Sequence, residues 1–149
     1  MRKLNLKTSI LGKQHVKIDA PVIKVWSILT GINDWHKWQT RARKAKLRSN
    51  LEPGATFTYQ VALLKFKSNI DSCEPFHSFG WTSKLPGSFK TIKWVLESEN
   101  KSTNVTVEES IKGPLYALLN GPLTKKLEKK MARRLADLKM ASEKNTLDS

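Results

Sequence analysis

One carboxylate in this sequence stands where an apolar residue is expected. From Val105 to Ile111 apolar side chains alternate with polar ones, and Glu109 falls in the apolar register. A strand with this alternation turns one face toward the core, and a buried carboxylate is costly unless it is paired or protonated. Glu109 is therefore predicted to meet a lysine or arginine, to lie by water or ligand in a pocket, or to exchange places with Glu108 through a β-bulge.

The residues that could act as nucleophiles or metal ligands are few and scattered. Cys73 and His77 lie four residues apart, but the alternation of their strand predicts that Cys73 points to the outer face. The histidines His15, His36 and His77 fall in different elements, so they lack the spacing of a zinc site. The sequence has no Gly-x-Ser-x-Gly elbow, P-loop or dinucleotide-binding glycine motif. We therefore predict no catalytic nucleophile, no metal and no cofactor.

Hydropathy patterning predicts the elements that must position these side chains. Residues 15–18 alternate like a short strand, and Asp19-Ala20-Pro21 predicts a helix with Asp19 or Ala20 at its cap. A second, short helix is predicted over Ile32–Trp38. Period-two alternation then predicts strands over residues 43–48, 55–63, 65–72, 79–85, 92–96 and 105–111. Because short turns join these strands, antiparallel pairing is expected.

The rest of the chain has the pattern of one long amphipathic helix, whose apolar stripe is Leu115, Leu119, Leu123, Leu127, Met131, Leu135 and Leu138. Gly121-Pro122 interrupts it, so the helix is kinked there or restarts with Pro122 in its first turn. A hinge that lets Leu115–Asn120 act as a gate is the alternative. The predicted fold is α+β: a curved antiparallel sheet of six to seven strands wrapped around a long C-terminal helix, with two short helices after the first strand.

Composition narrows the class of protein. The 149 residues include one cysteine, which excludes a disulfide framework. No stretch approaches the ~20 apolar residues that a membrane-spanning helix needs. The basic N-terminus resembles a signal peptide, but Asn5, Lys7 and Lys13 interrupt its apolar part. We predict a single domain over residues 1–149 in a cytoplasmic protein, either a monomer or a homodimer.

The charge balance bears on possible binding partners, because 27 Lys and Arg against 13 Asp and Glu give a net charge of +14. Two basic runs contribute, one over residues 41–48 and one over residues 125–134. They are either solvated faces or docking surfaces for an anionic membrane or for RNA phosphates. RNA recognition usually adds exposed aromatic side chains. Most aromatics here fall on inferred core faces, so nucleic acid is not an expected partner.

Several segments, in this order, resemble the START-related superfamily, also called SRPBCC, of polyketide cyclase/dehydrase and lipid-transport-like proteins. They are Asp19-Ala20-Pro21 with Val25-Trp26, Trp35-His36-Lys37-Trp38, Leu51-Glu52-Pro53-Gly54 with Phe57, Glu74-Pro75 with Gly80-Trp81, Trp94-Val95-Leu96-Glu97, Thr106-Val107-Glu108-Glu109-Ser110 with Gly113, and Leu135-Ala136-Asp137-Leu138-Lys139. The resemblance covers about residues 13–144. It implies the helix-grip fold and a deep apolar cavity for lipids, sterols, polyketides or other hydrophobic molecules.

The ligand-binding pocket is expected between the sheet and the C-terminal helix. Its predicted lining is the inward-facing side chains together with the short helix and the start of the long one: Trp35, Trp38, Phe57, Tyr59, Phe66, Ser68, Phe79, Trp81, Ile92, Trp94, Glu109, Tyr116 and Leu119. Ser83 is a further polar candidate. The other interpretation of these rings is that they simply fill the core.

We therefore predict a protein that binds or carries a hydrophobic small molecule. A cyclase, dehydratase or hydrolase on the same scaffold is the alternative, and general acid–base chemistry would then fall to Glu109 or Asp71. Such an enzyme needs at least two titratable groups that converge in the pocket. A basic module that docks on membrane or RNA is the third possibility.

Overall fold

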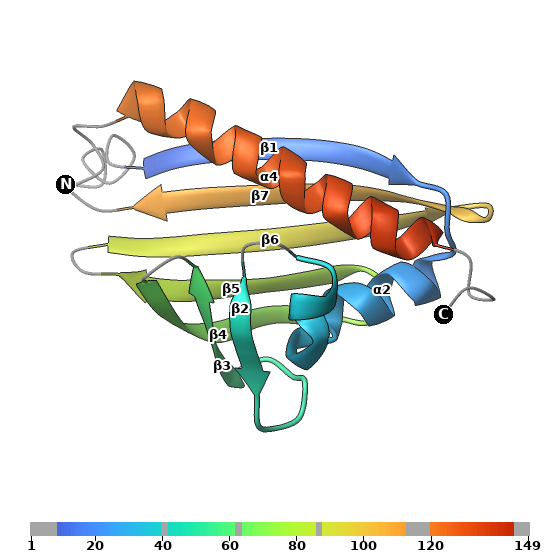
Figure 1. Ribbon diagram of the computed structural model, residues 1–149, viewed down its shortest axis with the longest axis horizontal. Helices are drawn as coiled ribbons and strands as arrows, with labels where there is room; N and C mark the ends of the chain where they lie inside the picture. The colour runs from blue at the N-terminus through green and yellow to red at the C-terminus, as the bar shows by residue number, and fades with distance from the viewer. Residues whose placement is uncertain (1–8, 40–41, 62–63, 86–87, 113–119, 145–149) are drawn as a thin grey trace.

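The computed structural model describes residues 9–39, 42–61, 64–85, 88–112 and 120–144. They form one curved antiparallel sheet with all helices on one side of it (Figure 1). In chain order the elements are β1 (Ser9–Ile18), α2 (Val22–Thr30), the 3₁₀ helix η1 (Ile32–Lys37), β2 (Arg43–Leu47), β3 (Thr56–Val61), β4 (Leu64–Glu74), β5 (Ser78–Leu85), β6 (Ser88–Glu99), β7 (Ser102–Lys112) and α4 (Asn120–Glu143). The α+β prediction is confirmed.

The sheet has seven strands in the order β1-β7-β6-β5-β4-β3-β2, and each neighbouring pair is antiparallel. The first strand is longer than the sequence predicted, because it pairs with β7 from Ser9 onward. Gly12 hides the alternation in this stretch. A Cβ atom on Gly12 would lie 3.0 Å from the Met131 sulfur of α4, so the glycine lets the helix approach the strand closely.

The helix α4 packs its apolar stripe on this side of the sheet. Leu127, Met131, Leu135 and Leu138 are all buried. The described helix begins at Asn120, so Pro122 stands in its first turn, where a missing N–H costs nothing. The residues before Asn120, which distinguish a kink from a restart, lie outside the described ones. The proposed gate over residues 115–120 falls almost entirely on residues outside the described ones.

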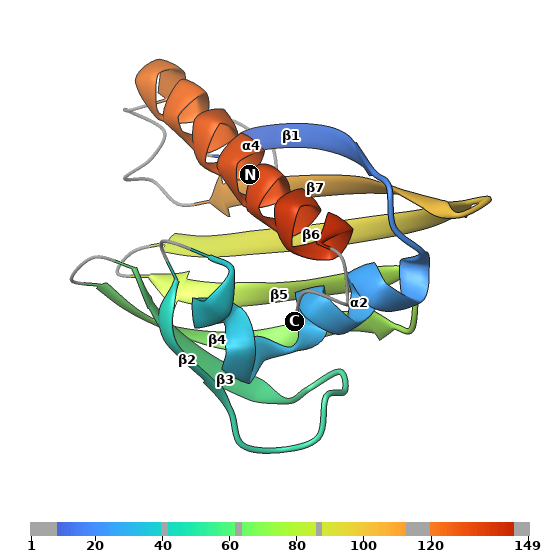
Figure 2. The same cartoon turned by 45° about the vertical axis from the view of Figure 1, so that its right-hand side comes forward.

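The helix α2 (Val22–Thr30) packs near the C-terminal end of α4. Figure 2 shows the C-terminal end of α4 close to α2, and the Lys24 ammonium there donates to the carbonyl of Lys144 at 2.6 Å. The helix α2 starts one residue later than predicted, with Pro21 rather than Asp19 or Ala20 at its cap. Proline fits this position, since its fixed φ suits an extended residue before the helix. No helix among the described residues is long and apolar enough to cross a membrane.

The prediction that Cys73 faces outward was wrong. The register of β4 against β5 shifts between Ile70 and Ser72, which is a β-bulge. The extra residue reverses the alternation, so Cys73 pairs with the buried Phe79 and is itself half-buried against the core. Burial raises the pKa of the Cys73 thiol. Such a thiol is a poor nucleophile at neutral pH.

Candidate functional site

A buried ion triad lies between the sheet and α4. Glu109 of β7 is 1% exposed. Its Oε1 accepts a hydrogen bond of 2.7 Å from Nη1 of Arg134, and its Oε2 lies 3.2 Å from Nζ of Lys90. Burial alone would raise the pKa of Glu109, but Lys90 and Arg134 outweigh it and hold that pKa below its ordinary value of 4.5. The inward orientation predicted for Glu109 is thus observed, and its partner is a lysine and an arginine together.

The sequence analysis missed Lys90 as a member of this site. Lys90 stands on β6 in the same register as Ile92 and Trp94, and it is 9% exposed. Its ammonium also lies 5.2 Å from the ring centre of Phe66. The sequence did carry a signal for Lys90. The alternation of Ile92 and Trp94, continued two residues toward the N-terminus, places Lys90 on the same inward face.

The assignment of Arg134 to the basic outer face of the long helix was wrong. Arg134 follows Met131 by three positions and precedes Leu138 by four, which places it on the buried face of α4. Its side chain is only 12% exposed. Burial by itself would lower the pKa of this guanidinium, but Glu109 raises it above its ordinary value, so Arg134 stays charged.

Hydrogen-bond donors without partners gather beside the triad. A small internal cavity of about 10 Å³ is lined by Tyr59, Trp81, Trp94 and Arg134, with Leu29, Trp35, Gln39, Ala42 and Val61. The hydroxyl of Tyr59 and the indole nitrogens of Trp81 and Trp94 are buried, and none of them has a hydrogen-bond partner among the described residues. Buried donors are normally satisfied, so this arrangement calls for an acceptor from outside the described chain.

Aromatic rings fill most of the space around this cavity. Trp35 meets Phe57 at 5.6 Å and Trp81 at 5.3 Å between ring centres, and Tyr59 stacks on Phe66 at 5.0 Å. The sheet–helix interior of the described residues is thus a packed aromatic core around a void of water size. These residues do not form the large ligand pocket that was expected between the sheet and the C-terminal helix.

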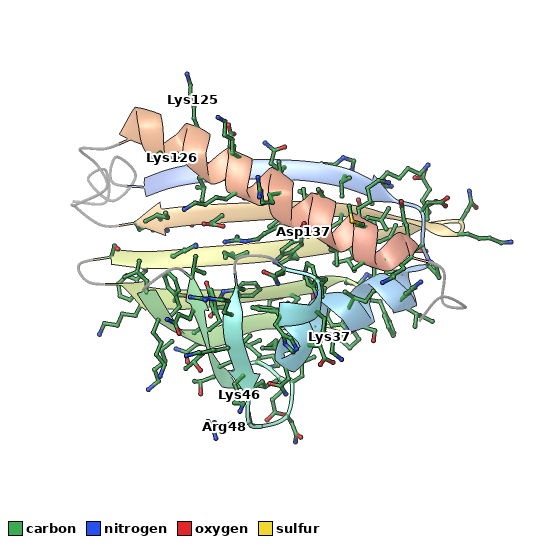
Figure 3. The ribbon with its side chains drawn as sticks, viewed as in Figure 1. Lys37, Lys46, Arg48, Lys125, Lys126 and Asp137 are labelled. Atoms are coloured by element: carbon green, nitrogen blue, oxygen red, sulfur yellow. The ribbon has the colours of Figure 1, made fainter. Side chains whose placement is uncertain are left out.

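A larger space opens elsewhere, as a groove of about 770 Å³ between α2, η1 and the last turns of α4. This volume is in the range typical of small-molecule sites. The lining mixes apolar and charged side chains: Ser27, Ile28, Gly31, Asp34, Lys37, Trp38, Asp137, Met140, Ala141, Glu143 and Lys144. Two of these residues are labelled in Figure 3, Asp137 on α4 and Lys37 on η1.

The groove and the internal cavity share their walls. On α2, Ile28 lines the groove and the next residue, Leu29, lines the cavity. On α4, Asp137 lines the groove and Arg134, one turn earlier, lines the cavity. At η1, Trp38 lines the groove and Trp35, one turn earlier, lines the cavity. The two spaces are therefore neighbouring layers of one region of the fold.

The structure distributes the predicted pocket residues over both layers. Trp38 lines the groove, whereas Trp35, Tyr59, Trp81 and Trp94 line the cavity. The remaining buried members surround the cavity without lining it: Phe57, Phe66, Ser68, Phe79, Ile92 and Glu109. Tyr116 and Leu119 lie outside the described residues.

The polar candidates beyond Glu109 separate in space. Ser68 and Ser83 are buried and share a hydrogen bond of 2.7 Å, so each satisfies the other. Asp71 is exposed at the bulge and accepts a hydrogen bond from Thr82. Of the two alternatives named for acid–base chemistry, Asp71 therefore lies on the surface and only Glu109 reaches the interior. Among the described residues no group of three or more metal-binding side chains converges.

A seven-stranded curved sheet closed over a long C-terminal helix defines the helix-grip fold of START-related proteins. The chain belongs to the family described as polyketide cyclase / dehydrase and lipid transport, whose family model matches residues 10–143. The resemblance predicted from the sequence is confirmed. A comparison with curated proteins finds no match.

Solved structures share the fold at low sequence identity. A START superfamily protein from Mycobacterium smegmatis has a TM-score of 0.76 and 12% identity over 89% of this chain and 97% of its own. The aromatase/cyclase Zhui from Streptomyces sp. R1128 has a TM-score of 0.75 and 13% identity over 91% and 94%. The di-domain ARO/CYC BexL has a TM-score of 0.76 and 17% identity over 93% of this chain, which spans about half (52%) of BexL.

Proposed function

We propose that this chain binds an apolar small molecule, as a single ligand-binding domain, in the groove between α2, η1 and α4. The observation that carries the proposal is the groove itself, with a volume of about 770 Å³ and a wall that includes Trp38, Ile28 and Met140. Met140 is 75% exposed there, so its side chain is accessible to a ligand. Membership in a family named for polyketide cyclases and lipid transport supports the same function.

The driving force would be removal of apolar surface from water, at about 25 cal/mol per Å². Methionine suits this use, because its unbranched chain adapts to ligands of different shape. The charged rim, where Lys37 lies 3.4 Å from Asp34, would stay hydrated and leave the apolar floor to the ligand. The mechanism requires no chemistry from the protein.

The test blocks the groove and measures binding of N-phenyl-1-naphthylamine, a neutral apolar probe that fluoresces when it leaves water. Ala141 lines the groove and is half-buried. Ala141→Trp should weaken probe binding about tenfold or more, because the indole would occupy the probe's volume. The matched control is Ala136→Trp, on an exposed position of the same helix. Equal binding by both variants, or no probe binding by the unmodified protein, would contradict the proposal.

An enzyme of cyclase type is the second candidate. Its support is the fold shared with the aromatase/cyclase Zhui and the convergence of Glu109, Lys90 and Tyr59 in one interior region. In such a reaction the Tyr59 hydroxyl would protonate a substrate carbonyl oxygen while an enol carbon bonds to that carbonyl carbon, and the enol O–H proton would return to Tyr59 through solvent. The new hydroxyl would then leave as water together with a proton from the adjacent carbon. Incubation with a linear poly-β-ketone thioester and detection of the dehydrated ring by mass spectrometry tests this. A Tyr59→Phe protein is the control.

Docking to an anionic membrane is proposed for the outer face of α4, which carries Lys125, Lys126, Lys129, Lys130 and Arg133. Each basic residue near such a surface contributes about 1 kcal/mol. Figure 3 shows Lys125 and Lys126 at one end of the molecule and Lys46 and Arg48 on the opposite side, so the two basic runs do not make one plane. Cosedimentation with phosphatidylserine vesicles at low salt tests for this docking.

A further inference from the structure

We propose that the interior site beneath the groove binds an anionic oxygen of the ligand, so that the ligand is an apolar molecule ending in a carboxylate or an acidic enol or phenol. The inference rests on the proposed function and adds the chemical class of the ligand. It comes from the buried side chains of β3, β5, β6 and α4 rather than from the groove.

The first argument is three buried donors that have no hydrogen-bond partner in the described part of the chain. The indole nitrogens of Trp81 and Trp94 can only donate, and the Tyr59 hydroxyl can donate as well. The three side chains are 4%, 1% and 3% exposed, and all line the same small cavity. Donors whose side chains line one small cavity are complementary to an oxygen acceptor there, as in the sites that stabilise oxyanions.

The charge of the interior is the second argument. Lys90 and Arg134 are both buried, and Glu109 is their shared anionic partner. Two cations against one carboxylate leave one positive charge in excess in a region of low dielectric. A single water would accept two hydrogen bonds but would not compensate this charge. An anionic oxygen would satisfy the donors and balance the charge together.

The proposal places the two parts of such a ligand in the two spaces, whose lining residues are neighbours along α2 and α4. Its apolar body would lie in the groove against Trp38 and Ile28, while its oxygen would pass between Leu29 and Arg134 into the cavity. The cavity's own volume, about 10 Å³, suits an oxygen rather than a ring or chain. Ligand pockets usually combine a mostly apolar lining with a few polar groups that orient the ligand.

The experiment compares two ligands that differ only in the terminal group. Dodecanoate and 1-dodecanol are titrated at neutral pH against protein carrying N-phenyl-1-naphthylamine, and displacement of the probe is followed by fluorescence. We expect dodecanoate to displace the probe at about tenfold lower concentration than dodecanol, as a charge-assisted hydrogen bond would give. Equal displacement by both ligands, or none by either, overturns the inference. Continued probe binding in those cases leaves the proposed function standing, whereas failure to bind the probe contradicts the function itself.

Two variants test whether the buried donors cause the preference for dodecanoate over dodecanol. Tyr59→Phe removes only a hydroxyl, and Trp94→Phe removes the indole N–H together with part of the ring; each should lower the preference for dodecanoate about threefold or more. Trp26→Phe is the matched control, since Trp26 is buried against Phe79 but does not line the cavity. A preference that survives both donor variants overturns the inference.

The melting temperature of Tyr59→Phe separates a ligand-binding role of the hydroxyl from a structural one. A structural role predicts a lower melting temperature. A hydroxyl without a partner among the described residues can be removed without loss of stability, so the melting temperature should stay constant or rise. A lower melting temperature with an unchanged ligand preference would show that the hydroxyl serves the fold, and would overturn the inference.

Discussion

The guanidinium of Arg134 meets the carboxylate of Glu109 at 2.7 Å, and this contact joins α4 to the sheet inside the apolar core. The two residues are 25 positions apart in the chain. Lys90 completes the triad from β6. The arrangement leaves the interior with more positive than negative charge, and several consequences can be measured.

Glu109→Gln should destabilise the fold strongly. The amide removes the charge that compensates Arg134 and Lys90, and leaving buried charges without a partner typically costs about 3–5 kcal/mol. Urea denaturation measures the change. The control is Glu108→Gln, whose partner Lys13 lies 3.4 Å away on the surface. That exposed pair should cost less than about 1 kcal/mol, and equal losses for the two variants would contradict a buried triad.

The same carboxylate should make stability depend on acid pH. The folded-state pKa of Glu109 is lowered from 4.5 by Lys90 and Arg134 despite its burial. Its contribution is therefore complete above the unfolded value of 4.5 and is lost as pH falls through the lower folded value. Melting temperatures measured from neutral to strongly acidic pH should fall in that window. The fall should be smaller in Glu109→Gln, and an identical profile would assign the acid sensitivity to other groups.

Gly80→Ala should destabilise the sheet between β5 and β6. A Cβ atom on Gly80 would lie 2.9 Å from the backbone carbonyl oxygen of Ile92, which cannot move without disturbing the strand pairing. The expected cost is about 1–3 kcal/mol in urea denaturation. Gly54→Asn is the comparison, because that glycine has a φ of +93° and open space around it. Asparagine tolerates a positive φ better than other residues do, so its cost should be the smaller one.

Cys73 should react slowly with thiol reagents. Its pKa is raised by burial, so the thiolate is scarce at neutral pH. We expect iodoacetamide to alkylate the folded protein much more slowly than the urea-unfolded chain, with both rates followed by mass spectrometry. A folded-state rate that exceeds the unfolded one would instead indicate an activated thiol. His77→Ala should leave the slow rate unchanged.

The sequence by itself determined the elements and their order. Alternation along the strands and the four-residue steps of Leu127, Met131 and Leu135 are local consequences of strand and helix geometry, so they can be read without coordinates. The inward position of Glu109 followed from the same alternation, and a cationic partner was one of its expected outcomes. Lys90 and Arg134 obey these rules as well and could have been predicted.

Only the tertiary structure decided where space remains. The bulge near Asp71 turns Cys73 inward, and no turn residue signals it in the sequence. The aromatic rings close the interior to about 10 Å³ while α2, η1 and α4 leave a groove of about 770 Å³ outside it. Cavity volume is the small difference between a shell and the side chains that fill it. It therefore depends on rotamers and on approach distances between elements, which residue types and spacing do not encode.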